Sequence, residues 1–237
     1  MDPLDLHSFL DLIDEGFNVV PLHVTLQLDR ETPVSLYQRL EDRAIFLLES
    51  AAVGEATGRY SFIGLDRRWR LTTHDEATVV EGATRRESDL APLVELRRML
   101  GTYQTYVPSD LPDFVGGAVG FVTYDYVRRL ERLPPRDTHS TWPDVDFSFP
   151  GVVLICDHLR HSTTVVVLAL VDGDPVEVYH DARARLDELV TTLLTSAPLG
   201  DAAVERLVAT APSPKAAPPF AADARPPTAI EPVAVAP

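Results

Sequence analysis

The chain has 237 residues, of which 45% are hydrophobic and 24% are charged, and its 36 Asp and Glu residues against 21 Lys and Arg residues give a net charge of -15. This length suffices for one sizeable core with an appended segment, but hardly for two full domains. Because Cys156 is the single cysteine, disulfide frameworks and cysteine-based zinc or iron–sulfur sites are excluded, and the acidic balance argues against nucleic-acid binding, which needs a basic face.

The sequence also argues against membrane attachment. Its longest apolar stretch, Thr163 to Val171, has about half of the ~20 residues that a spanning helix needs. The N-terminal residues Met1-Asp2-Pro3-Leu4-Asp5 carry acid where a secretory signal carries base. We therefore expect a cytoplasmic protein.

A shift in composition predicts a domain boundary near the C-terminus. Eight of the 20 prolines and nine alanines fall between Ala211 and Pro237, and each proline removes a backbone donor and disfavours helix in the residue before it. We predict a folded domain over residues 1–208 and a Pro/Ala-rich disordered tail or linker over residues 209–237.

The first half of the predicted domain mixes helical and strand-like patterns. Apolar residues at near-helical spacing predict a helix from Leu6 to Ile13, and Gly16 ends it. A strand follows within residues 17–28, and Thr32 with Pro33 begins a short helix that reaches Leu40. Short apolar runs between glycine-containing and charged turns predict four strands, at residues 45–48, 60–63, 69–71 and 78–80. Residues 90–99 are predicted to form a helix. That helix is expected to place Leu93, Leu96 and Leu100 on one side.

The second half repeats the mixture without an internal repeat. Residues 116–121 predict a glycine-rich strand, residues 127–133 a helix, and residues 152–156 and 163–170 a hairpin. Asp174 and Pro175 begin the last helix, which presents one apolar face made of Ala182, Leu186, Leu189, Val190 and Leu193. Because the elements lack the regular rhythm of a doubly wound sheet, we predict an α+β fold with a mixed, largely antiparallel sheet and helices packed outside it.

Most polar motifs in the sequence have a structural interpretation. His158 and His161 could be metal ligands, but a polar turn between two apolar strands explains them better. Cys156 ends a strand and is interpreted as a core residue rather than a nucleophile. Residues 116–120, Gly-Gly-Ala-Val-Gly, lack the spacing of a dinucleotide loop, and their glycines indicate close approach of another backbone or a bulky ring.

Two neighbouring segments indicate a binding site. Residues 46–51 end an apolar strand in Glu49 and Ser50, and about ten residues later Arg59 and Tyr60 open the next strand. If these strands are neighbours, the four side chains meet at one sheet end, where they offer an acceptor for an ammonium group and donors for a carboxylate. This inventory suits a zwitterionic amino acid in a partly apolar pocket. A surface ion pair at a strand end is the alternative.

The order and spacing of several motifs resemble the N-terminal region of anthranilate synthase component I. The resemblance spans roughly residues 5–195, and the related component I of aminodeoxychorismate synthase shares much of it. The motifs that carry it are Phe46-Leu-Leu-Glu-Ser50, Gly58-Arg-Tyr-Ser-Phe-Ile-Gly64, Gly116-Gly-Ala-Val-Gly-Phe-Val-Thr-Tyr-Asp-Tyr-Val-Arg128, Glu131-Arg-Leu-Pro134, Gly16-Phe-Asn-Val-Val-Pro21 and Asp29-Arg-Glu-Thr-Pro-Val-Ser-Leu-Tyr37. The Glu of the first motif and the second motif as a whole favour the anthranilate enzyme.

The resemblance implies a function and a regulatory site. Component I of this family converts chorismate to anthranilate and pyruvate with magnesium and with ammonia from a separate glutamine amidotransferase subunit, and tryptophan inhibits it. Carried over by position, the tryptophan contact is Ser50, with Glu49 and Leu48 lining the same pocket and Arg59 as a further contact. The implied fold is one half of a two-sheet sandwich, and such an isolated half would expose apolar sheet surface, for which residues 116–121 are a candidate.

The sequence departs from the family in length. Members are roughly twice as long, and the motifs of their catalytic C-terminal half, such as Pro-Ser-Pro-Tyr-Met and Gly-Thr-x-x-Arg, do not occur here. We therefore expect a regulatory and scaffold half that is inactive alone, holds no cofactor, and acts with a separately encoded chorismate-binding half, as a truncated or split gene product. The alternatives are a stand-alone amino-acid-binding regulatory module, the corresponding part of the aminodeoxychorismate enzyme, and a vestigial fragment.

Overall fold

The computed structural model describes residues 4–28, 30–49, 58–74, 77–133 and 142–195. The chain divides into two units, Met1–Pro198 and Leu199–Pro237, and all described residues belong to the first. The predicted boundary between residues 208 and 209 lies outside the described residues and stays a prediction.

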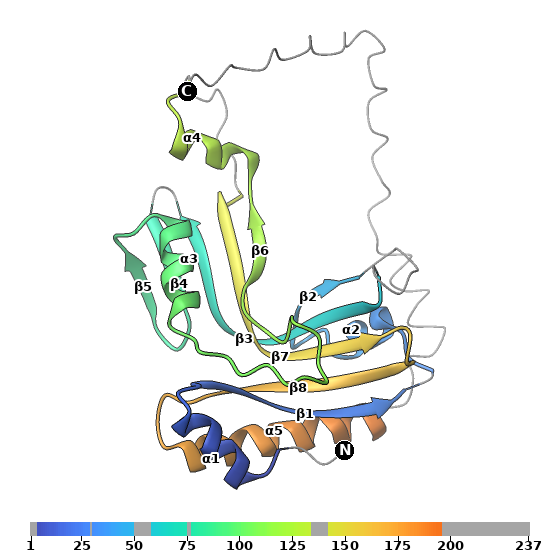
Figure 1. Ribbon diagram of the computed structural model, residues 1–237. Helices are drawn as coiled ribbons and strands as arrows, with labels where there is room; N and C mark the ends of the chain where they lie inside the picture. Colours follow the sequence, from blue (N-terminus) through green and yellow to red (C-terminus); the bar gives the residue numbers. More distant parts are fainter. Residues whose placement is uncertain (1–3, 29, 50–57, 75–76, 134–141, 196–237) are drawn as a thin grey trace, which may run out of the picture. The chain divides into compact units, whose positions relative to one another are not determined.

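The described part combines helices with one sheet (Figure 1). The helices are α1 (Leu6–Asp14), α2 (Pro33–Arg39), α3 (Pro92–Gly101), α4 (Val127–Leu130) and α5 (Pro175–Thr195), with a single 3-10 turn, η1 (Tyr124–Tyr126). The strands are β1 (Val19–Gln27), β2 (Ala44–Leu48), β3 (Tyr60–His74), β4 (Ala77–Glu81), β5 (Arg85–Ser88), β6 (Val119–Val122), β7 (Val145–Asp157) and β8 (Ser162–Leu170).

All strands of the described residues pair antiparallel in the order β1-β8-β7-β3-β4-β5, with β2 on β3 and β6 on β7. The long strands β3 and β7 run side by side from Tyr60↔Asp157 to Thr72↔Asp146, and each changes its other neighbour part-way. β7 pairs first with β6 and then with β8, while β3 pairs first with β2 and then with β4. The predicted α+β class with a largely antiparallel sheet is confirmed.

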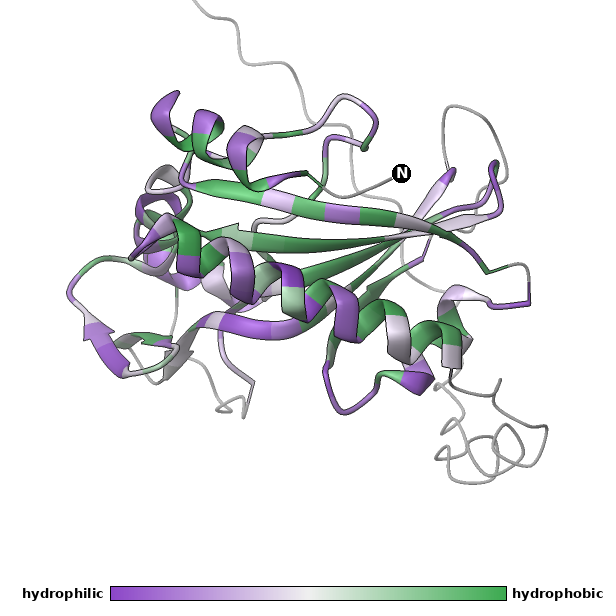
Figure 2. Ribbon diagram, turned by 90° about the horizontal axis from the view of Figure 1, so that it is seen from below, coloured by the Kyte–Doolittle hydropathy of each residue, from purple (hydrophilic) through white to green (hydrophobic). Residues whose placement is uncertain are grey.

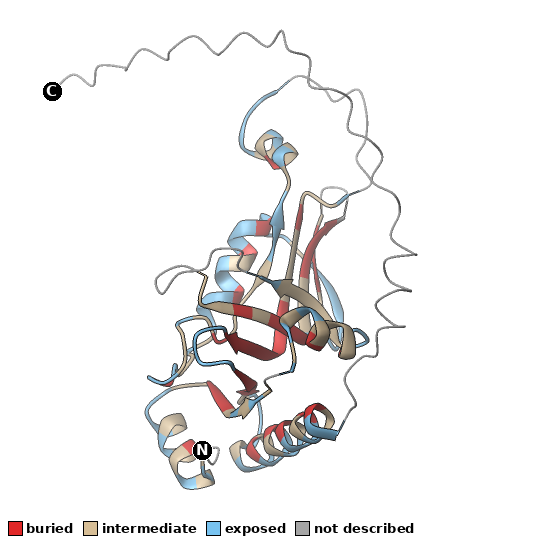
Figure 3. Cartoon of the chain, turned by 90° about the vertical axis from the view of Figure 1, so that its right-hand side faces the viewer, coloured by how far each residue is buried: buried red, intermediate tan, exposed pale blue. Residues whose placement is uncertain are grey.

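Helices α1, α2 and α5 cover one face of the sheet, and α5 contacts β8 and β1 (Figure 2). The opposite face of the same strands packs against residues 103–114, which connect α3 towards β6. In β7, Val152 and Leu154 belong to the core on the α5 side of the sheet, and Val153 and Ile155 belong to the core on the opposite side. Because both faces are covered, the sequences of β7 and β8 are nearly continuous apolar runs and do not alternate between apolar and polar residues. Buried residues lie along both strands and along α5 (Figure 3).

Local signals in the sequence place the ends of α1 and α2 to within one residue, whereas the helix predicted over residues 127–133 ends at Leu130. Thr32 accepts a hydrogen bond from the Ser35 amide at 3.1 Å, and the Ser35 hydroxyl accepts one from the Thr32 amide at 2.9 Å, which completes a capping box before α2. Gly16 follows α1 with a φ of 102°, a conformation that strains other residues. The predicted last helix is confirmed as α5, whose buried side includes Ala182, Leu186, Leu189 and Leu193.

Three predictions about elements were wrong. Residues 60–63 and 69–71 do not form separate strands, because β7 pairs with β3 from Tyr60 to Thr72 across a register shift between Arg67 and Trp69. In α3 the buried residues are Pro92, Glu95 and Met99, whereas Leu93 and Leu100 are exposed. Strand β5 was missed because its sequence, Arg-Arg-Glu-Ser, has no apolar alternation, and it is positioned by pairing with β4.

The glycines of residues 116–120 do permit close approach, as the sequence predicts. A Cβ on Gly120 would overlap the carbonyl oxygen of Asp146 and lie 2.6 Å from the Cα of Phe147, both in β7. A Cβ on Gly116 would lie 2.5 Å from a methyl carbon of Leu168. The contacts of Gly120 are with backbone and leave no room for a larger side chain, whereas a side chain at Gly116 would require Leu168 to move.

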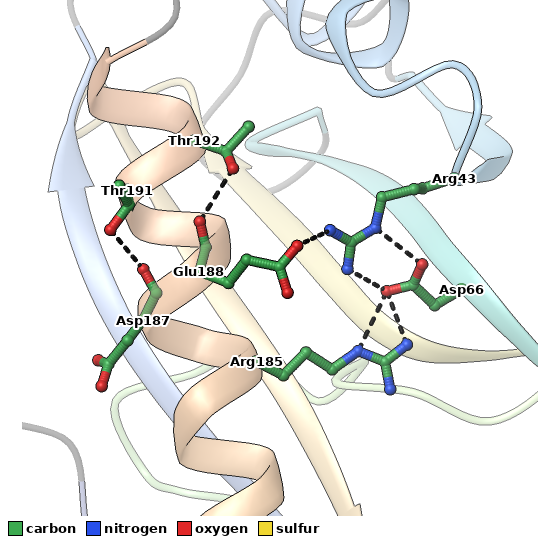
Figure 4. A network of polar contacts seen from close by, with 7 residues as sticks. All are labelled: Arg43, Asp66, Arg185, Asp187, Glu188, Thr191 and Thr192. Carbon is green, nitrogen blue, oxygen red and sulfur yellow. Dashed lines mark hydrogen bonds and ion pairs between the residues drawn. The ribbon is translucent and has the colours of Figure 1, made fainter.

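A cluster of charged side chains fastens α5 to the bend in β3 (Figure 4). Asp66 accepts hydrogen bonds from Arg43 at 2.7 and 2.9 Å and from Arg185 at 3.2 Å, and Arg43 also reaches Glu188 at 3.1 Å. Burial raises the pKa of Asp66, but the hydrogen bonds from the two arginines outweigh burial and leave the pKa below its ordinary value. The cluster therefore joins three segments that are distant in the sequence.

Candidate functional site

The two segments that the sequence singles out are neighbours in the sheet. β2 pairs with β3 so that Leu48 lies opposite Phe62. Glu49 follows β2 directly and is exposed, and Arg59 immediately precedes β3. The condition of the prediction, that the two strands are neighbours, therefore holds, and it brings Glu49, Arg59 and Tyr60 to one end of the sheet. Ser50 lies outside the described residues.

Arg59 is engaged by a carboxylate from the adjacent strand. Its Nε and Nη2 atoms donate to both oxygens of Asp157, at 2.6 to 3.2 Å. The hydrogen bond to Asp157 raises the pKa of Arg59. Burial works to raise the pKa of Asp157, but hydrogen bonds from Arg59 and from the amides of Arg160 and Leu159 lower it below its ordinary value. Both groups are therefore held in their charged forms.

This ion pair still leaves part of the guanidinium for a ligand. Arg59 has five N–H donors in a planar fork, and within the described residues its Nη1 atom makes no hydrogen bond. Asp157 thus orients the side chain while Nη1 keeps two donors for a second anion. The guanidinium also lies 4.8 Å from the ring centroid of Tyr60, which restricts it further.

An aromatic row lies beside the polar groups. The rings of Tyr60 and Phe62 are 6.1 Å apart between centroids, and Phe114 meets Phe62 edge-on at 5.1 Å. All three rings belong to the core opposite α5, and Leu48 lies across from Phe62 in register. An apolar surface with a cation at its end fits an amino acid that has an apolar side chain.

The other face of the same sheet end contains buried polar groups. Ser61 is fully buried, and its hydroxyl lies 2.8 Å from Nε2 of His158. Cys156, opposite Ser61 in register, has its pKa raised by burial to about 11, so its thiol stays protonated at neutral pH. This supports the interpretation of Cys156 as a core residue and of His158 as part of a hairpin turn.

The ion pair at this site was not foreseen from the sequence. Asp157 and Arg59 are 98 residues apart, and no local spacing indicates that they meet.

Among the described residues, no group of three or more His, Cys, Asp or Glu side chains could hold a metal ion. No helix in the described ranges has the length and apolar character needed to cross a membrane.

Comparison with known proteins finds relatives that share one name. The chain is 31% identical over 188 residues to anthranilate synthase component 1 of Acetivibrio thermocellus, a match covering 77% of this chain and 38% of the relative. For the proteins of the same name from Pseudomonas aeruginosa and Mycolicibacterium smegmatis the identities are 35% over 198 residues and 37% over 194 residues, covering 80% and 76% of this chain and 40% and 36% of the relatives. The chain thus spans about two fifths of the length of the curated relatives that it matches.

The chain was also compared with solved structures and with protein-family models. The solved structure of anthranilate synthase component I from Streptococcus pneumoniae is 25% identical, with a TM-score of 0.49 over 73% of this chain and 37% of that chain. No protein-family model matches the sequence.

Proposed function

Because the chain is related to the N-terminal region of anthranilate synthase component I, we propose that it supplies the regulatory and scaffold part of an anthranilate synthase. The observation that carries this proposal is 31 to 37% identity to several such proteins over about three quarters of the chain. In the proposed assembly, chorismate and ammonia give anthranilate and pyruvate, and the part of the relatives that the match does not cover binds chorismate and supplies the chemistry.

The same division applies to magnesium and to the ammonia source. The resemblance implies magnesium for the synthase reaction, yet the described residues gather no set of donor side chains that could hold a metal. We therefore assign no step at the metal to these residues. Ammonia comes from a glutamine amidotransferase subunit in this proposal, and no residue of the chain is assigned to that contact.

We assign feedback inhibition by tryptophan to the end of strands β2 and β3. Nη1 of Arg59 is available to the carboxylate of the amino acid, and Glu49 is assigned a contact from the resemblance. Leu48 and the row of Tyr60 and Phe62 supply apolar surface for the indole ring. Ser50 is assigned a contact from the resemblance alone.

An exposed apolar surface supports docking of the catalytic part. Phe121 of β6 is 41% exposed, Tyr124 and Leu130 are 92% and 71% exposed, and Trp142 packs edge-on against Phe121 while 70% exposed. These four residues form what we call the β6 surface. It begins at the end of the stretch of residues 116–121 that the sequence indicates and extends beyond it, and clustered apolar exposure of this kind marks interaction sites.

Reconstitution tests the proposed function. The full chain is mixed with the separately produced catalytic part of the Pseudomonas aeruginosa relative, and anthranilate fluorescence is followed with chorismate, ammonium and magnesium. We expect activity from the mixture and none from this chain alone. Phe121→Lys should weaken association strongly, whereas Leu194→Lys, at an exposed apolar residue of α5, should not.

The identity of the product and the binding of tryptophan distinguish the alternatives. An aminodeoxychorismate product in place of anthranilate would assign the chain to the folate branch. Calorimetric titration of the reconstituted assembly with tryptophan should give saturable heat that Arg59→Gln and Ser50→Ala abolish and that Arg160→Gln, on the nearby exposed turn, does not. Equal tryptophan binding by the chain alone would favour the stand-alone regulatory module.

A further inference from the structure

Strands β7 and β8 separate at one point, and an arginine crosses the opening. Their pairing ends at Val152↔Val167, so the Leu168 carbonyl loses its neighbour on that side. Arg68, at the register shift of β3, fills this gap and donates from Nη2 to the Leu168 carbonyl at 2.8 Å.

The opening contains a cavity of about 180 Å³. One wall is aromatic, because Trp69 stacks on Tyr103 at 5.5 Å between centroids and meets Phe149 edge-on at 6.1 Å. Gly116 and Gly117 line another wall, and a side chain at Gly116 would require the side chain of Leu168 to move. The glycine-rich motif thus borders a space as well as a strand.

Arg68 brings a guanidinium with unused hydrogen-bond donors to this cavity. Within the described residues it makes the single hydrogen bond to Leu168 and no ion pair with a carboxylate, and its guanidinium lies 5.5 Å from the Trp69 ring centroid. Burial lowers the pKa of Arg68 and the positive charge of Arg185 lowers it further, whereas the negative charge of Asp172 opposes this decrease. An arginine with unused donors beside aromatic rings suits a planar anion, since carboxylates match the guanidinium fork.

We infer that this cavity, the Arg68 cavity, binds a small aromatic carboxylate with a single ring, with the carboxylate on Arg68 and the ring beside Trp69 and Tyr103. The volume supports one ring, because an apolar cavity of roughly 150 Å³ takes up benzene. Asp113, an exposed acidic residue, also lines the cavity. It disfavours a second anionic group and accepts a hydrogen bond, so a ring that carries an amino group next to its carboxylate fits better than an unsubstituted one.

Titration of the full chain with benzoate and with 2-aminobenzoate tests this inference without any activity assay. Trp142→Phe leaves Trp69 as the sole tryptophan, and the fluorescence of Trp69 reports occupancy of the cavity beside it. We expect saturable binding of both compounds, tighter for 2-aminobenzoate, with no displacement by L-tryptophan. The inference is thereby separable from the proposed tryptophan site at β2 and β3.

Variants locate the bound molecule. Arg68→Met should weaken benzoate binding at least about tenfold, since a charge-assisted hydrogen bond is lost, while Arg68→Lys should weaken it less and Arg67→Met, at an exposed neighbour, should not change it. Asp113→Asn, at an exposed residue, tests the cavity even if Arg68→Met fails to fold, because it should reduce the advantage of 2-aminobenzoate over benzoate. Non-saturable binding, equal binding by the Arg68 variants, or displacement by tryptophan would overturn the inference.

Discussion

Glu95 of α3 is 1% exposed, yet it carries a charge that two arginines compensate. Arg98 and Arg86 donate to it at 2.7 and 2.6 Å, and Ser88 donates at 3.1 Å. The hydrogen bond from Arg98 lowers the pKa of Glu95 most, burial opposes it, and Arg86 and Ser88 add to the decrease, so that the pKa falls from 4.5 to about 2. At 1.36 kcal/mol per pKa unit, this difference corresponds to about 3 kcal/mol of stability.

Glu95→Gln should therefore lower the free energy of unfolding by about 2 to 3 kcal/mol at pH 7, where the lower figure allows for solvent screening of the two half-exposed arginines. Because the folded pKa lies below the unfolded one, the stabilisation from Glu95 is fully present above pH 4.5 and is lost as the pH falls towards 2. The difference between wild type and Glu95→Gln should shrink over this same interval, since the protonated glutamic acid resembles the amide.

Urea unfolding curves of the full chain at pH 7, 4.5 and 2.5, followed by circular dichroism, measure this difference. Glu87→Gln is the matched control, because Glu87 is exposed on β5 and its replacement should change stability by less than about 0.5 kcal/mol. A Glu95→Gln effect that is the same at all three pH values, or one no larger than that of the control at pH 7, would refute the electrostatic reasoning.

Three further outcomes are expected. Gly120→Ala should destabilise the fold by about 3 kcal/mol or more, because its Cβ overlaps the β7 backbone, whereas Gly101→Ala, with open space around it, should be neutral or stabilising in thermal melts. Asp66→Asn keeps a residue that tolerates the φ of 54° but loses charge-assisted hydrogen bonds. It should therefore lower the free energy of unfolding by roughly 2 kcal/mol at pH 7, and this loss should fade below pH 4. A loss of stability that does not depend on pH would contradict this reasoning. Cys156, the sole thiol, should react with iodoacetamide only as fast as the protein unfolds, and rapid alkylation under native conditions would show that its burial is misjudged.

Helix ends and buried strands were predictable because their signals are local. The Thr32 capping box, Gly16 after α1 and the apolar face of α5 each depend on residues within a few positions of one another. The hairpin of β7 and β8 was recognisable from two apolar runs around a polar turn. These features are decided by backbone sterics and by hydrophobic periodicity, which the sequence displays directly.

Features that depend on distant neighbours were not predictable. The polar strand β5 exists because β4 pairs with it, and Glu95 lies on the buried side of α3 because arginines from two elements compensate its charge. The meeting of Glu49 and Arg59 at one sheet end was foreseen on the condition that β2 and β3 pair, but the capture of Arg59 by Asp157 was not. Contacts between residues that are distant in the sequence produce no periodic pattern from which they could be predicted.

The sequence by itself determined the α+β class, the positions of most helices and strands, and the relationship to anthranilate synthase component I, because each of these depends on local patterns or on motifs in a fixed order. The tertiary structure alone decided that β3 is one continuous strand, that Arg59 is oriented by an ion pair, and that Arg68 faces a cavity where β7 leaves β8. The physical reason is that hydrogen-bond partners and empty space are properties of segments brought together by folding, often about a hundred residues apart in the chain.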